Sequence, residues 1–202
     1  MNSAWTDGEL WFSYTQLEEI DEIGQMLAKE SVCEHMFFGP NTLEETRDYF
    51  LPLVQPMQDA VDQGELPGAH VFTIRRPAAR PDDRAFVGQC AALPVAYGRG
   101  NYVIGYQLDE PFWGQGYGTR ACLFLIWYCF DVLAAHRLSG DCLASNPGSA
   151  RIMEKCGFQR EGAQRHYYHS RGRLHDILLY GLLRGELTRD LGQLRTQFRP
   201  VD

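Results

Sequence analysis

Two periods of hydrophobic residues alternate along the chain and mark the elements that we expect. Residues 10–15 (LWFSYT) are typical of a short strand, and the apolar residues within 17–30 recur at helical spacing. A second helix is expected to begin at Asn41 or Thr42, either of which can cap its first turn. The prolines and glycines of the stretch 55–69 predict an irregular or partly helical connector after it.

Strand-like alternation follows this connector. The segments 70–75, 85–96 and 101–108 predict three strands, with a surface turn over the Pro/Arg/Asp stretch 76–84 and a glycine turn near Gly98. Because short turns join consecutive strands, we expect an antiparallel meander.

The pattern then changes to that of a βαβ unit. A glycine-rich loop at 111–118 leads into a strongly apolar helix that ends near Ala135, and a strand follows at 137–144. Such a unit places two parallel strands side by side. A further helix over 147–157 and two strands within 159–183 complete a single domain. The long helix is apolar nearly all round, so it is expected to be buried within the subunit or against a copy of itself.

Composition and charge narrow the possible partners. The 202 residues are 45% hydrophobic and 22% charged, which is ordinary for a globular domain. The net charge of -7 disfavours nucleic acid as a partner. Residues 1–65 carry fourteen acidic and two basic residues, whereas the remainder has a small excess of basic residues. The acidic part is either a set of solvated helix faces or a surface that attracts a cation.

Metal ions, membranes and export are not expected. The six cysteines have irregular spacings, and the six histidines form no metal-binding motif, so buried apolar cysteines are the simpler interpretation. The longest apolar stretch, 121–130, is too short to span a bilayer. A basic segment followed by an apolar one is missing from the first residues, so we expect a cytoplasmic protein.

The loop between the strand at 101–108 and the long helix is the candidate phosphate site. Its sequence, Phe112 to Thr119 (FWGQGYGT), lets the backbone approach an anion, and the helix that follows adds unpaired N–H groups. A tight turn that binds nothing is the alternative. A Walker loop is excluded because no lysine follows the glycines. The pattern GxGxxA with Asp141 beyond it matches a dinucleotide fingerprint. In that fingerprint the glycines follow directly after the strand, whereas residues 109–113 lie between the strand and the glycines here.

Three segments together carry a family resemblance: WGQGYGTRA at 113–121, NPGSARIMEKCGF at 146–158 and GRLHDILLY at 172–180. They resemble the GNAT superfamily of acyl-CoA N-acyltransferases, in particular its ribosomal-protein-alanine N-acetyltransferase branch. The resemblance covers residues 9–185 and leaves 186–202 as a C-terminal tail. It implies an α/β (α+β) GNAT fold, in which a mixed, mostly antiparallel, twisted sheet is flanked by helices on both faces. One departure is Trp113, where the family usually has Gln or Arg.

The resemblance also implies the cosubstrate and the residues that hold it. Acetyl-CoA is expected to place its diphosphate on the loop amides, its pantetheine beside the splayed parallel strands, and its sulfur near Ser149. Asn146 would bond the pantetheine, although plain N-capping explains it equally well. The implied cofactor-binding set is Gln107, Leu108, Trp113, Gly114, Gln115, Gly116, Tyr117, Gly118, Thr119, Asn146, Ser149, Arg151 and Lys155, with no metal.

The implied reaction is acetyl transfer to a primary amine by direct attack in a ternary complex. Ser149 is the candidate near the leaving sulfur, with Tyr167 or Tyr168 as competing acids. The candidate bases are Glu34, His35 and Glu161.

The acidic first third of the chain suggests a cationic acceptor: a basic protein N-terminus, a polyamine or an amino-sugar. A monomer or a homodimer is expected. The alternative function is a non-catalytic acyl-CoA sensor or scaffold.

Overall fold

The computed structural model describes residues 2–77 and 84–201. Within them, nine strands form one sheet in the order β7-β8-β6-β5-β4-β3-β2-β1-β9. Neighbouring strands are antiparallel except for β5 and β6, which run parallel. The strands are β1 (Ala4–Thr6), β2 (Trp11–Tyr14), β3 (His70–Pro77), β4 (Arg84–Pro94), β5 (Asn101–Leu108), β6 (Arg137–Leu143), β7 (Gln159–Ser170), β8 (Arg173–Leu183) and β9 (Arg199–Pro200).

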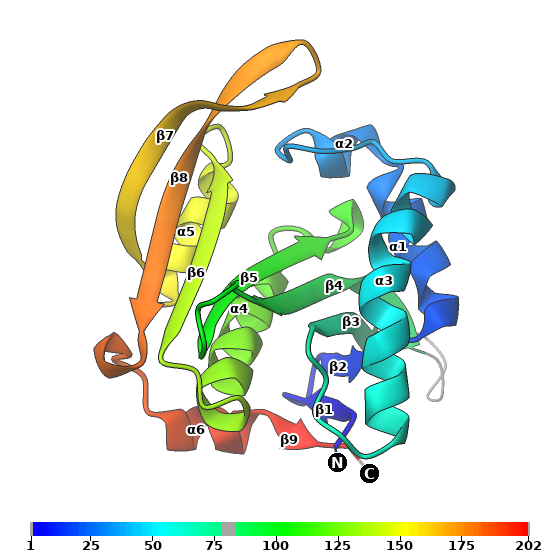
Figure 1. Cartoon of the computed structure of the whole chain (residues 1–202), viewed down its shortest axis with the longest axis vertical. Coiled ribbons are helices and arrows are strands. Elements are labelled where there is room, and N and C mark those ends of the chain that lie inside the picture. Colours follow the sequence, from blue (N-terminus) through cyan, green and yellow to red (C-terminus); the bar gives the residue numbers. More distant parts are fainter. Residues whose placement is uncertain (1, 78–83, 202) are drawn as a thin grey trace.

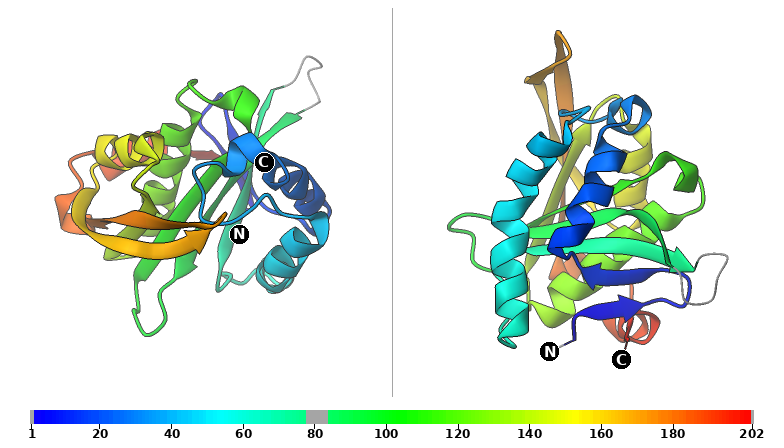
Figure 2. Two further views of the ribbon diagram at one scale, coloured as in Figure 1. Left: turned by 90° about the horizontal axis from the view of Figure 1, so that it is seen from above. Right: turned by 90° about the vertical axis from the view of Figure 1, so that its right-hand side faces the viewer.

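Helices cover both faces of this sheet (Figures 1 and 2). They are α1 (Ile20–Leu27), α2 (Glu30–Cys33), α3 (Leu43–Asp62), α4 (Tyr117–Trp127), α5 (Pro147–Lys155) and α6 (Leu191–Gln197). The first two long helices, α1 and α3, lie on one face beside β3 and β4, and α4 lies on the other beside β4 and β5. The expected GNAT fold, with a mixed, mostly antiparallel sheet between helices, is therefore confirmed.

The connector expected over 55–69 as irregular or partly helical is helical over its first half, because α3 continues through Pro52 and Pro56 to Asp62. Both prolines are exposed, whereas Phe50, Val54 and Met57 form the buried face of the helix. The missing N–H groups thus lie on the solvent side, where water satisfies the freed carbonyls.

Two other expectations need adjustment. The helix expected over 17–30 is divided, since a 3-10 turn (Leu17–Glu19) precedes α1 and the chain bends at Ala28 before α2 begins. Of the turn expected over 76–84, residues 78–83 lie outside the described part of the chain, and the residues on either side continue β3 and β4.

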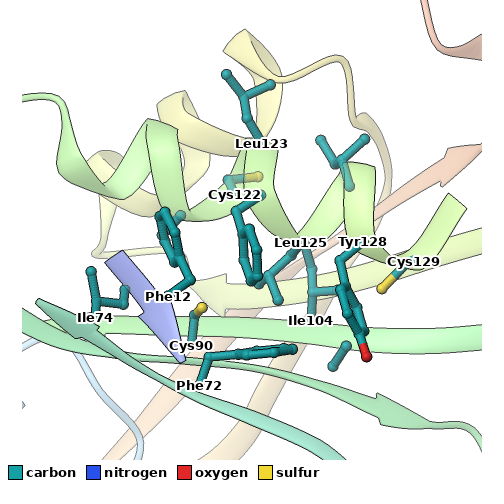
Figure 3. Packing of buried hydrophobic residues seen from close by; sticks show 14 of the residues in the cluster. Phe12, Phe72, Ile74, Cys90, Ile104, Cys122, Leu123, Leu125, Tyr128 and Cys129 are labelled. Atoms are coloured by element: carbon teal, nitrogen blue, oxygen red, sulfur yellow. The ribbon is translucent and has the colours of Figure 1, made fainter. Parts of the chain in front are cut away.

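The apolar helix α4 is buried inside the subunit. It continues as a π-helical turn (Tyr128–Val132), and Tyr128 is fully buried against the sheet (Figure 3). Phe124 is fully buried as well. Phe124 stacks on Phe12 with ring centroids 4.2 Å apart. In the part of the chain that the structure describes, no helix is both long and apolar enough to cross a membrane.

The segment after residue 185 joins the same sheet. The short strand β9 pairs with β1, and Phe198 at the end of α6 is fully buried against Phe12 and Trp127. The C-terminal residues thus extend the core beneath α4.

Strands β5 and β6 separate partway along their length. They pair over three residues only, Asn101–Val103 with Arg137–Ser139. Beyond this point β5 keeps its pairing with β4, and β6 keeps its pairing with β8. The sheet therefore opens between the C-terminal ends of β5 and β6, and the backbone that faces this opening has no partner strand.

Candidate functional site

The glycine-rich loop sits at the end of β5 and begins α4. Gly114 and Gly116 have φ values of +73° and +81°, a region that other residues enter only with strain. A Cβ at either glycine would meet nothing within 4 Å, so this surface of the loop is open. Gly116 is the N-cap of α4, and in the described part of the chain no side chain caps it. The first N–H groups of an eleven-residue helix are therefore free to bind an anion.

Two side chains hold the loop from outside. The indole Nε1 of Trp113 donates to the carbonyl oxygen of Leu108 at 2.8 Å. The side-chain amide of Gln115 donates to the carbonyl oxygen of Pro111 at 2.9 Å. Trp113 thus anchors the loop to the end of β5. Its side chain has this structural role in place of the phosphate contact that Gln or Arg would make at the same position. The same bond occupies the Leu108 carbonyl, which limits what Leu108 can offer to pantetheine.

A continuous cleft of about 990 Å³ runs from this loop through the opening between β5 and β6 to α2 and α3. Ten of the sequence-predicted site residues line it: Gln107, Leu108, Trp113, Gly114, Gly116, Tyr117, Gly118, Thr119, Asn146 and Ser149. Five others do not line it: Gln115, Arg151, Lys155, Tyr167 and Glu161. The cleft therefore has one part beside α4 and α5 and a second part on the opposite face of the sheet.

Ser149 lies in the first turn of α5, at the centre of a small polar cluster. Its backbone N–H donates to Oδ1 of Asn146 at 3.0 Å, so Asn146 is an N-cap. The Asn146 side-chain amide donates to the His35 carbonyl oxygen at 3.4 Å. On the other side, the Tyr106 hydroxyl lies 3.3 Å from Ser149 Oγ.

Tyr106 is a functional candidate that the sequence analysis missed. Burial raises the pKa of its hydroxyl well above the usual value, so it stays protonated and can donate to Ser149. The alternation of β5 could have indicated Tyr106. Successive strand residues face opposite sides of the sheet, so Tyr106 faces α5 because Gln107 faces the other side.

Glu161 is removed from the candidate bases. Its carboxylate pairs with Arg137 at 2.5 Å, and this contact lowers its pKa. Arg137 begins β6, whereas the cleft reaches the opposite end of that strand at Asp141 and Leu143. The two side chains meet across β8, directly over Gly181, which has no side chain to separate them.

Tyr167 and Tyr168 lie on the hairpin formed by β7 and β8, which extends toward α2 (Figure 1). Tyr167 is 54% exposed and lies outside the cleft. Tyr168 stacks on Phe37, with ring centroids 4.1 Å apart and planes 7° from parallel. Arg171 at the tip of the hairpin donates to the carbonyl oxygens of Cys33 and Gly39 at 2.5 and 3.1 Å. The segment 33–39 is thus held across the cleft by contacts with the hairpin.

The acids of the first third are mostly directed away from the cleft. Among the described residues 2–65, Glu45 is the one acidic residue that lines it. Its carboxylate accepts from the backbone and hydroxyl of Thr42, which lowers its pKa. Asp21 and Glu19 instead pair with Arg47 and Arg75. The acidic composition therefore does not create an acidic cleft.

Of the three candidate bases, His35 lines the cleft and Glu34 does not. Asp141 on β6 also lines it, and its side chain is exposed to the cleft. The surrounding protein partly desolvates this carboxyl and raises its pKa. Across the described ranges, no three His, Cys, Asp or Glu residues are grouped as a metal site would require.

Comparison with known proteins identifies the family. The model of the acetyltransferase (GNAT) domain matches residues 9–159. An uncharacterized N-acetyltransferase p20 from Bacillus licheniformis is 28% identical over 187 residues, which cover 92% of this chain and 98% of that protein.

Solved structures show the same fold. A spermidine N-acetyltransferase from Vibrio cholerae in complex with CoA and spermine has a TM-score of 0.71 at 14% identity and covers 88% of this chain and 97% of its own. A ribosomal-protein-S5-alanine acetyltransferase from Vibrio fischeri has a TM-score of 0.70 at 17% identity, covering 90% and 96%. With a family model that spans three quarters of the chain and the loop, opening and cleft described above, the protein belongs to the GNAT family of acetyltransferases.

Proposed function

We propose that this protein is an N-acetyltransferase that transfers the acetyl group of acetyl-CoA to a primary amine by direct attack in a ternary complex. The amine belongs to a protein N-terminus or to a cationic small molecule. The observation that carries the proposal is the continuity of the cleft, which joins an anion-binding helix start to a second chamber through the opened sheet. A cosubstrate and an acceptor can therefore meet between β5 and β6.

The residues present fit coenzyme A. The amides of Gln115, Gly116, Gly118 and Thr119 would hold its diphosphate at the start of α4, where the helix dipole favours negative charge. The unpaired backbone near Gln107 would bond the amides of the pantetheine arm as a neighbouring strand does. Arg151 and Lys155 on α5 are exposed and outside the cleft, so their proposed part is limited to phosphates that protrude from it.

The chemistry needs three groups in addition to the two substrates. The amine nitrogen forms a bond to the thioester carbon, the C–S bond breaks, and the thiolate takes a proton. The ammonium of the acceptor loses two protons in all, and the first would reach the thiolate through the Ser149 hydroxyl, which contacts the protonated hydroxyl of Tyr106 and takes up this proton as it gives its own. The second proton lost by the ammonium goes to solvent, and His35 at the cleft is the candidate that would relay it. A backbone N–H near the end of β5 would stabilise the carbonyl oxygen.

Thiol release from acetyl-CoA, measured with a panel of primary amines, tests this proposal. Release that depends on both the amine and the enzyme, with the acetylated amine found by mass spectrometry, is the expected result. The alternative is a non-catalytic acyl-CoA sensor. It predicts CoA binding at micromolar concentration, seen as a thermal shift, and no release with any amine.

A further inference from the structure

The chamber on the α3 side of the sheet has a floor of small residues. Val71, Ala91 and Gly105 are paired across β3, β4 and β5, so they share one face of the sheet. A Cβ added at Gly105 would meet nothing within 4 Å. All three residues line the cleft. The row of small residues therefore borders open space, which no side chain of the described chain fills.

The walls of this chamber are apolar. They comprise Tyr49, Phe50 and Leu53 of α3, Met36 and Phe38 of the segment 33–39, and Leu93 of β4. Phe50 is buried, and Leu53, Met36, Phe38 and Leu93 are half-buried. An acceptor that reaches the opening between β5 and β6 from this side therefore places whatever follows its amine against hydrocarbon and aromatic rings.

Polar groups are concentrated at one end of the chamber, next to the opening. Gln89 and Gln107 are directly paired across β4 and β5, two residues from the Ala91–Gly105 pair and on the same face. Gln89 is only 5% exposed, and the side-chain oxygens of both glutamines are buried without a hydrogen-bond donor in the described residues. A buried oxygen without a donor destabilises a fold unless a ligand supplies one.

Asp141 adds a negative charge on β6, across the opening from β5. On β6, Gly140 lies against Met153 of α5, so the neighbouring Asp141 points to the opposite face of the sheet, toward the chamber. It is in none of the ion pairs found within residues 2–77 and 84–201. The carboxylate on β6 and the two amide oxygens on β4 and β5 thus flank the opening from its two sides, and three acceptors are the number that one ammonium group can use.

We propose that the acceptor is a primary monoamine that bears an apolar or aromatic group, with its nitrogen at Asp141, Gln89 and Gln107 and its apolar group in the chamber. This inference rests on the proposed acetyl transfer and narrows its acceptor class. A polyamine fits less well, because its second ammonium would lose its water among mostly apolar walls, and Glu45, the one acidic residue of α3 that lines the cleft, already accepts two hydrogen bonds from Thr42.

A matched pair of amines tests the proposal on the unmodified chain. Pentylamine and 1,5-diaminopentane share a five-carbon chain and differ in the second amino group. At saturating acetyl-CoA, kcat/KM from thiol release should be roughly 10-fold to 100-fold higher for pentylamine. Leucinamide should exceed glycinamide by a similar factor, and 2-phenylethylamine should exceed spermidine. Equal values, or a preference for the diamine or spermidine, would overturn the proposal while the transferase activity stands.

Two variant pairs locate the recognition. Leu53→Gln should lower kcat/KM for pentylamine about 10-fold with the KM for acetyl-CoA unchanged, whereas Leu51→Gln on the exposed side of the same helix should have no effect. Asp141→Asn should raise the KM for the amine at least about 10-fold. Asp48→Asn, an exposed acid on α3, is its control. Equal effects within either pair would contradict the assigned sites.

The outcomes distinguish a failure of the proposed acetyl transfer from a failure of the proposed acceptor. Silence with every amine, despite a thermal shift with CoA, refutes the proposed acetyl transfer. Active acetylation with the reverse amine preference refutes only the apolar acceptor.

Discussion

Replacing Gly116 by alanine tests two properties of the loop separately: the cost of its left-handed backbone conformation and its binding of CoA. Gly116 has φ +81° and ψ 0°, a left-handed conformation that costs an alanine about 1–2 kcal/mol. Because a Cβ there would meet nothing within 4 Å, no steric term is added in the absence of ligand. For a chain of this size, the melting temperature should fall by about 2–8 °C.

Gly64 is the matched control for this substitution. It follows α3 with φ +74°, and a Cβ there would also meet nothing within 4 Å. Gly64→Ala should therefore lower the melting temperature by a similar amount.

CoA binding should distinguish the two variants. In Gly116→Ala, the new methyl group lies on the open surface of the loop, where it displaces the anion from at least one backbone N–H. Loss of one hydrogen bond to a charged group costs about 1.5–3 kcal/mol, so the Kd for CoA should rise roughly 10-fold to 150-fold. Isothermal titration with CoA measures this change. If both variants bind CoA as the unmodified chain does, the diphosphate is not held at this loop.

Three further predictions follow from other contacts. Tyr106→Phe and Ser149→Ala should each lower kcat about 10-fold with little change in the KM for acetyl-CoA. The double variant should lose no more activity than either single variant, since the two hydroxyls act as one unit. Losses that multiply in steady-state kinetics would contradict this. Burial lowers the pKa of His70 from 6.5 to about 4, so between these pH values the imidazole takes up a proton in the unfolded chain but not in the folded one. The free energy of unfolding should therefore fall by about 3 kcal/mol as the pH drops through this range. His70→Gln should remove most of that slope in urea titrations; an unchanged slope would assign it to other groups. Arg171→Ala should lower the hydrogen-exchange protection of residues 33–39 about 10-fold and leave α4 unaffected, because two charge-assisted hydrogen bonds to carbonyl oxygens are lost; equal loss in α4 would indicate global destabilisation instead.

The sequence alone determined the elements whose cause is local. The strand β5 has the predicted bounds, 101–108, because the alternation and the flanking glycine turn are encoded within a dozen residues. The start of α4 and the glycine-rich loop were predictable for the same reason, since positive φ values like those of Gly114 and Gly116 favour glycine. Asn146 was predicted with two possible roles, and the structure shows it to be an N-cap.

Elements that depend on distant contacts were decided by the tertiary structure. The prolines and glycines of 55–69 left open whether this stretch is irregular or partly helical, and the buried face of Phe50, Val54 and Met57 stabilises α3 as far as Asp62. The residues 191–200 carry little local signal and are ordered because Phe198 fits against rings from other parts of the chain.

The candidate site divides in the same way. The loop at 112–119 is contiguous and was found from spacing, whereas the pair Tyr106–Ser149 joins residues 43 apart and depends on how α5 packs beside β5. Glu161 could not be excluded from the sequence, because its partner Arg137 is 24 residues away on β6, and β8 lies between the two strands. The sequence linked Asp141 only to a chance nucleotide motif, and its place at the cleft follows from where β5 and β6 separate. Local backbone preferences are encoded residue by residue, but the side chains that meet across a cleft are selected by the packing of the whole sheet.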